Sequence, residues 1–164
     1  ITKIYFPREI IPLSGIAVAF IDFIIAAFVF AGMLLIYRIP FTIYSLWFFP
    51  LFLLLLLFTA GMSLVLSALN VYYRDVNLAI NFLIQLWFFA TPIFYSADAL
   101  PDKFKIILFL NPLAFVIENI RKCVLRGSPV IWWHYLLMLT LISAIAFLSY
   151  KLFKSTEKRF ADVI

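Results

Sequence analysis

Residues 15–37 read GIAVAFIDFIIAAFVFAGMLLIY, with Asp22 as the single charged side chain in the run. A helix needs about 20 residues to cross the hydrocarbon core of a bilayer, so this stretch is long enough to span it. Arg38-Ile39-Pro40 follows, and proline disfavours helical backbone in the residue before it. The run therefore predicts a transmembrane helix over residues 15–37.

The composition of the whole chain indicates the same class. Of the 164 residues, 66% are apolar, 20% are aromatic and only 13% are charged, whereas a soluble domain is about half apolar and a quarter charged. A chain of this length exposes much of its surface, so the apolar excess needs lipid as its solvent. The long apolar runs favour helices over a β-barrel of alternating segments. The sequence predicts an all-α integral membrane protein, a polytopic helical bundle.

Three further spans are predicted, over residues 45–69, 76–95 and 132–150. Pro50 falls near the start of the second, where a missing N–H costs least. Thr91-Pro92 lies where the third should end, and Trp132-Trp133-His134 opens the fourth as candidate interfacial belt residues. Flanking segments cover residues 1–14 and 151–164.

Residues 96–128 predict two short helices. Pro101 can open the first, which would end near Leu110. Asn111-Pro112 supplies an N-cap followed by proline at the first helical position, and Gly127 is a plausible terminator. Neither helix is long enough to cross, so we expect a hairpin at the interface or part-way into the bilayer, with an amphipathic extramembrane loop as the alternative. The second helix carries Leu113, Val116, Ile117, Ile120 and Val124 at helical spacing, opposite Glu118, Asn119, Arg121 and Lys122.

The charge pattern excludes some partners and leaves the orientation open. The net charge is +5, but the basic residues flank apolar runs, which is typical of membrane helices and argues against a nucleic-acid partner. Four spans would place both chain ends on one side. The basic residues then divide seven to six between the two sides, which barely discriminates, although the basic tail mildly favours a cytoplasmic C-terminus. One side would hold Lys3, Arg8, Arg74, Lys151, Lys154, Lys158 and Arg159, and the other Arg38, Lys103, Lys105, Arg121, Lys122 and Arg126.

Two sets of side chains inside the predicted spans are candidates for contact with a transported solute. A carboxylate such as Asp22 costs about 2.5–3.5 kcal/mol at the centre of a membrane helix, so it should face a partner or water unless it lies nearer the interface. The second set is aromatic and could stack on the C–H faces of sugars, or simply pack and anchor the helices. It comprises Trp87, Phe88, Phe89, Phe94 and Tyr95.

Catalytic and nucleotide-binding motifs do not occur in the sequence. The chain has four glycines and no Gly-Lys-Ser/Thr sequence, so ATP would have to bind to another chain. A single cysteine, Cys123, and a single histidine exclude an intrachain disulfide and an ordinary zinc cluster. A membrane-embedded enzyme would need an acidic or histidine cluster, which scattered Asp98, Asp102, Glu118 and His134 do not supply. We therefore expect no enzyme and no cofactor in this chain.

Five short motifs occur in order along nearly the whole chain. They are KIYFPREIIPLS (3–14), NVYYRDV (70–76), TPIFY (91–95), LNPL (110–113) and FADVI (160–164). Each is weak alone, but the ordered series closely resembles the membrane subunits of type-2 ABC exporters that carry O-antigen, teichoic acid or capsular polysaccharide. Such permeases have six spans and an amphipathic N-terminal helix. The resemblance implies that this sequence lacks that helix and the first two spans and ends at the family's C-terminus.

The same resemblance implies a topology and roles for particular residues. Both termini would be cytoplasmic, and residues 96–128 would form a pair of gate helices on the far side. The implied gate residues are Pro101, Asn111, Pro112, Glu118 and Arg121. The segment around residues 5–9 resembles the element that couples to the ATP-binding subunit, with a snorkelling juxtamembrane segment as the alternative. The implied coupling residues are Tyr5, Phe6, Pro7, Arg8 and Glu9, joined by Tyr73, Arg74 and Asp75.

The resemblance also implies an assembly in the cytoplasmic (inner) membrane. Two copies of the permease would pair with two ATP-binding cassette subunits, which would hold ATP and Mg, and together they would form a channel for a lipid-linked polysaccharide. The aromatic residues and Asp22 would line that channel. The alternatives are a type-2 ABC exporter of drugs or lipids, and a purely structural scaffold without an ATPase partner.

Overall fold

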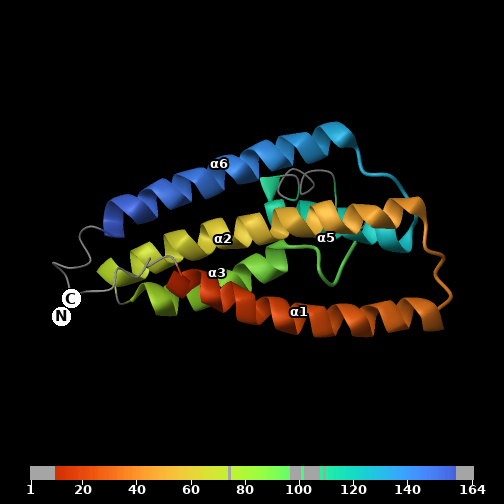
Figure 1. Cartoon of the computed structure of the whole chain (residues 1–164), viewed down its shortest axis with the longest axis horizontal. Helices are drawn as coiled ribbons and strands as arrows, with labels where there is room; N and C mark the ends of the chain where they lie inside the picture. The colour runs from red at the N-terminus through yellow and green to blue at the C-terminus, as the bar shows by residue number, and fades with distance from the viewer. Residues whose placement is uncertain (1–9, 74, 97–100, 102–107, 109, 158–164) are drawn as a thin grey trace, which may run out of the picture.

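The computed structural model describes residues 10–73, 75–96, 101, 108 and 110–157. Its regular elements in this part of the chain are helices, of which three are long and apolar enough to cross a membrane and one is a shorter apolar helix. Figure 1 shows α1, α2 and α6 running lengthwise through the molecule. The start of α1, the end of α2 and the end of α6 lie at one end, which we call the open-turn end; the α1–α2 connection and the start of α6 lie at the other, which we call the far end.

Helix α1 (Ile10–Ile36) confirms the first predicted helix and is already formed five residues before its predicted start. Its end is closed by a hydrogen bond from the Ile39 N–H to the Leu34 carbonyl at 3.0 Å. Arg38 takes the left-handed backbone conformation there, with φ 54°, at a position where glycine is usual. Only 6% of its most apolar stretch is buried against the described residues, so α1 presents the surface expected of a lipid-facing helix.

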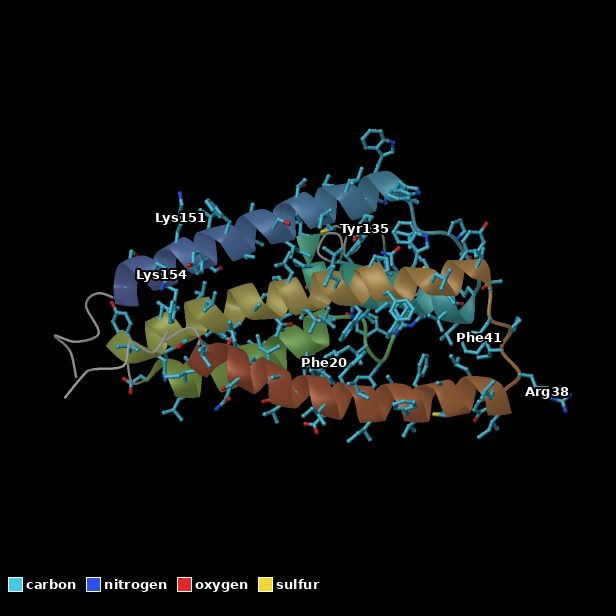
Figure 2. The ribbon with its side chains drawn as sticks, viewed as in Figure 1. Phe20, Arg38, Phe41, Tyr135, Lys151 and Lys154 are labelled. Atoms are coloured by element: carbon cyan, nitrogen blue, oxygen red, sulfur yellow. The ribbon has the colours of Figure 1, made fainter. Side chains whose placement is uncertain are left out.

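A short 3-10 helix, η1 (Ile43–Trp47), leads into α2 (Phe48–Tyr72), where the second helix was predicted. Pro50 lies in the first turn of α2, as expected from its missing N–H. Stacked rings join α1 to α2, with Phe23 and Phe52 centroids 4.2 Å apart. Figure 2 shows Phe20 on the same side of α1, directed towards α2.

Helix α3 (Val76–Ala90) is shorter than the predicted span of residues 76–95. Its 15 residues extend about 22 Å, less than the roughly 30 Å of the hydrocarbon core. The chain leaves the helical conformation at Thr91 (φ −100°, ψ 131°), because Pro92 disfavours a helical residue before it. The helix thus ends at the Thr91-Pro92 stop that the sequence predicted, and the last residues of the predicted span follow it as non-helical chain.

Helices α5 (Pro112–Leu125) and α6 (Trp132–Glu157) complete the described bundle. Helix α5 begins at Pro112 after the Asn111 cap, as predicted, and Gly127 ends it with a left-handed φ of 61°. Helix α6 continues seven residues past its predicted end at 150. The helix predicted after Pro101 falls mostly outside the described residues.

The hydrophobic core lies between α2, α5 and α6. Helix α2 has its most extensive contacts with α6, and α5 packs against α2 and η1. At the far end, Trp47 meets the rings of Trp132 and Tyr135 edge-on at 5.0 and 5.2 Å. Helix α5 is therefore a packed part of the bundle. The buried cluster comprises Leu51, Leu54, Phe58, Phe115, Val116, Cys123, Val130, Met138 and Ile142.

Candidate functional site

The densest polar contacts of the described structure lie where α3 ends and α5 begins. We call this region the α3–α5 junction: Trp87, residues 91–95, Asn111, Glu118 and Arg121. Figure 1 shows that α3 ends near the middle of the molecule, beside α5. The junction joins segments that are 20 to 29 residues apart in the chain.

Asn111 uses both ends of its side-chain amide. Its Oδ1 accepts hydrogen bonds from the Leu113 N–H, which caps α5, and from the indole Nε1 of Trp87, both at 3.1 Å. Its Nδ2 donates to Thr91 Oγ1 at 3.1 Å and lies 3.5 Å from the Ala90 carbonyl oxygen. The side chain is buried, so these partners replace water for a group that is costly to leave unpaired. Asn111 thus ties the start of α5 to the last turn of α3.

Thr91 was predicted to mark the end of the third span, but it was not among the predicted site residues. Its hydroxyl donates to the Trp87 carbonyl at 2.8 Å and accepts from Asn111, and the residue is 2% exposed. A threonine directly before proline was the available signal, because Pro92 stops the helix and frees carbonyls of its last turn that a hydroxyl can satisfy.

Arg121 holds the segment after α3 through its guanidinium group. Nη2 donates to the carbonyls of Pro92 and Ile93 at 2.9 and 3.0 Å. Nη1 donates to the Tyr95 carbonyl at 3.1 Å and to Glu118 Oε2 at 2.9 Å. A planar, permanently charged fork suits several converging acceptors, and charged hydrogen bonds are stronger than neutral ones. Arg121 therefore fixes an otherwise irregular loop against α5.

Glu118 was placed by helical spacing on the polar face of α5 with Arg121, and the structure adds that its side chain is buried. Glu118 is only 7% exposed. Pairing with Arg121, one helical turn away, explains how a carboxylate is accommodated there, because a buried charge requires a close partner. Its second oxygen, Oε1, has no hydrogen-bond partner within the described residues.

The predicted aromatic residues gather around the end of α3. The Phe88 ring meets Phe94 edge-on at 5.2 Å, and the Tyr95 hydroxyl donates to the Phe89 carbonyl at 3.0 Å. Phe94 is 80% exposed and Phe89 65%, so these rings are available to lipid or to a passing solute. Trp87 differs, because its indole N–H is bound to Asn111.

The remaining predicted site residues lie elsewhere. Asp22 is exposed on α1 and is not brought to the junction, and Pro101 is exposed. Tyr73 and Asp75 are exposed where α2 gives way to α3, at the open-turn end. The coupling residues Tyr5, Phe6, Pro7, Arg8, Glu9 and Arg74 lie outside the described residues.

These features define a polytopic helical membrane protein with an amphipathic helix fastened to the end of a shorter apolar one. Comparison with known families identifies the class: the family model for ABC-2 type transporters matches residues 3–125. The chain belongs to the ABC-2 type transporter membrane family, and it is a multi-span protein of the cytoplasmic membrane.

Curated relatives extend the likeness over the whole chain. Two proteins named O-antigen export system permease protein RfbA, from Klebsiella pneumoniae, are 31% and 32% identical over 166 aligned positions. The alignments cover all of this chain and 63% of each relative. A protein of the same name from Myxococcus xanthus is 28% identical over 125 positions, covering 73% of this chain and 46% of the relative. The chain thus spans less than two thirds of the length of these relatives.

Two substitutions of Asn111 should separate its cap from its amide donor. Asn111→Asp keeps an oxygen for the Leu113 N–H and for Trp87 but loses the bond to Thr91, whereas Asn111→Ala loses all of them. We expect Ala to lower stability by about 2 kcal/mol and Asp by about 1 kcal/mol. Thermal unfolding of the purified protein in detergent checks this order; equal stability of both variants and wild type would show that Asn111 does not hold the junction.

Proposed function

We propose that the protein is the channel-forming permease of an ATP-driven exporter that moves a lipid-linked, O-antigen-like polysaccharide across the cytoplasmic membrane. The observation that carries the proposal is the alignment with the two Klebsiella pneumoniae permeases, which runs the full length of this chain. The hydrophobic helices and the family membership support the same function.

The proposed assembly contains two copies of the full-length permease and two ATP-binding cassette subunits. ATP and Mg bind in those subunits, and this chain supplies no cofactor. Each full-length permease crosses the membrane six times, and residues 76–95 form the third of the four crossings in this chain, with α3 as its helical part. The family match and the relatives' names support an ATP-driven partner.

In the same proposal, the open-turn end faces the cytoplasm. Residues 5–9 and the Tyr73-Arg74-Asp75 turn contact the ATP-binding subunit, which suits the exposed positions of Tyr73 and Asp75. Residues 96–128 are the gate on the far side, and the junction joins this gate to α3. The exposed rings of Phe89 and Phe94 line the channel beside it, because many weak ring contacts let a sugar polymer slide.

Replacing Arg8 and Glu9 together with alanine tests the coupling role. We expect polymer at the cell surface to fall at least tenfold and the ATPase rate to lose its dependence on the permease, because the contact that transmits the ATP cycle is removed. Arg38→Gly is the control: it removes a charge at the opposite end of the bundle, where the side chain points away from the helices (Figure 2), at a backbone position that suits glycine.

Normal export and normal ATPase coupling in the double variant would refute the docking role. The substrate class is tested by deleting the gene: loss of surface polysaccharide supports the proposal. Retained polysaccharide would contradict it and favour export of a drug or lipid by the same architecture.

A further inference from the structure

A cleft of about 570 Å³ lies between α1 and α2 towards the open-turn end, with Ile80 of α3 at its side. Polar side chains line it from α2 at spacings of four, four and three residues, which places them on one face of the helix. They are Thr59, Ser63, Ser67 and Asn70. Polar side chains in succession along a membrane helix face a partner, water or a substrate path.

The hydrogen bonds of these side chains divide them into two pairs. Thr59 Oγ1 donates to the Leu55 carbonyl at 2.8 Å, and Ser63 Oγ to the Pro12 carbonyl of α1 at 3.2 Å. Within the described part of the chain, Ser67 and Asn70 have no side-chain hydrogen bond. An amide or hydroxyl left without a partner in hydrocarbon costs several kcal/mol, so these groups need a polar environment.

The opposite wall of the cleft is the face of α1 that carries Gly15, and this face leads to a carboxylate. A Cβ added at Gly15 would meet no atom of the described residues within 4 Å. Ala19 continues this face of α1, and Asp22 lies seven residues, or two turns, beyond Gly15 on the same face. Asp22 is exposed, and no hydrogen bond or ion pair joins it to a described residue. An unpaired carboxylate in a membrane span independently indicates water or a ligand on this face.

We propose that this α1–α2 cleft, continued by Asp22, is a hydrated surface that contacts the hydroxyl groups of the transported glycan in the cytoplasmic half of the path. The inference rests on the proposed function. Hydroxyl and amide groups both donate and accept hydrogen bonds, which matches the hydroxyl-rich surface of a sugar chain. The stripe begins at Asn70, near the end of α2, and reaches Thr59 about halfway along the helix, so it leads inwards from the membrane surface.

Accessibility to a thiol reagent distinguishes a hydrated cleft from one that is covered by another membrane helix, which its small residues would also suit. The native Cys123 gives little background, because it is fully buried and burial raises the pKa of its thiol, which leaves less reactive thiolate. Ser63→Cys and Ser67→Cys are compared with Leu69→Cys, which is exposed on α2 outside the cleft. The full-length protein with its ATP-binding partner is treated in inside-out vesicles with a membrane-impermeant methanethiosulfonate.

We expect the two cleft cysteines to react at least tenfold faster than Cys at position 69, and to be protected when the vesicles are loaded with a polyprenyl-pyrophosphate oligosaccharide. Reaction as slow as at position 69 would overturn the inference, since the cleft would then be covered by protein or lipid. Fast reaction that the oligosaccharide leaves unchanged would overturn the glycan contact.

A blocking substitution adds a transport readout. Gly15→Leu fills the cleft, and Gly32→Leu is its matched control, because a Cβ at either glycine meets no atom within 4 Å and Gly32 does not line the cleft. We expect Gly15→Leu to lower surface polymer at least tenfold with unchanged protein level and unchanged co-purification of the ATP-binding subunit. Normal export by Gly15→Leu would contradict the proposed role of the cleft but would not affect the proposed function. A gene deletion that retains surface polymer would instead refute the proposed function.

Discussion

Arg121→Met should lower the stability of the protein by about 3 kcal/mol, because it leaves Glu118 buried without its partner and frees three carbonyls of residues 92–95. Arg121 is itself partly exposed, which places the loss at the lower end of the range for a broken buried pair. The loss should be local, so backbone amides of residues 112–125 should exchange their hydrogens about a hundredfold faster. Hydrogen-exchange mass spectrometry of the purified protein measures this directly.

Two further variants isolate the contribution of the Arg121 guanidinium group. Arg126→Met removes an exposed arginine that directly follows α5 and donates a 3.3 Å hydrogen bond to Ser96 Oγ. This variant should change stability by less than about 1 kcal/mol. Adding Glu118→Gln to Arg121→Met should recover part of the loss, because an amide is less costly to bury than an unpaired carboxylate. Equal loss of stability in the Arg121 and Arg126 variants would show that the guanidinium of Arg121 does not hold the segment after α3 against α5.

The long elements of the fold could be predicted because lipid imposes a simple pattern on the sequence. A run such as residues 15–37 has to be a helix in hydrocarbon, whatever its neighbours are. Local signals also worked at Asn111-Pro112, where the cap and the first helical residue involve adjacent positions. Thr91-Pro92 likewise marked the end of α3, although apolar residues continue past it and lengthened the predicted span to residue 95.

The junction itself could not be predicted from local patterns. Trp87 and Asn111 are 24 residues apart, and the bonds of Arg121 to residues 92–95 span 26 to 29 residues. Helical periodicity places Arg121 and Glu118 on one face but does not say what faces them. Packing of α5 against α2 and η1 turned the expected polar face partly inwards, and Glu118 became buried with it.

A large side chain at Gly61 should disrupt the main contact of the bundle, the one between α2 and α6. A Cβ at Gly61 would lie 3.1 Å from Ala146 Cα and 3.5 Å from its Cβ, so each added atom would meet backbone that cannot rotate away. Gly61 is buried in the helix pair with the most extensive contacts, where small residues allow two membrane helices to approach closely. We expect Gly61→Leu to lower stability by about 3 kcal/mol, at the upper end of the usual loss from overpacking.

A graded series shows whether the effect is steric. Gly61→Ala demands a shift of only a few tenths of an ångström, and its higher helix propensity offsets about 1 kcal/mol, so it should be nearly neutral. Gly32→Leu adds the same side chain to open space on α1 and should not destabilise the protein. If Gly61→Leu unfolds in detergent at the same temperature as Gly32→Leu, then the close approach of α2 and α6 does not hold the bundle together. If Gly61→Ala and Gly61→Leu lower stability equally, the glycine serves backbone flexibility in place of close packing.

Helix α5 packs against the same helix α2, so a large side chain at position 61 that pushes α6 away from α2 should also loosen the α3–α5 junction. Faster amide exchange in residues 112–125 of Gly61→Leu would show this coupling.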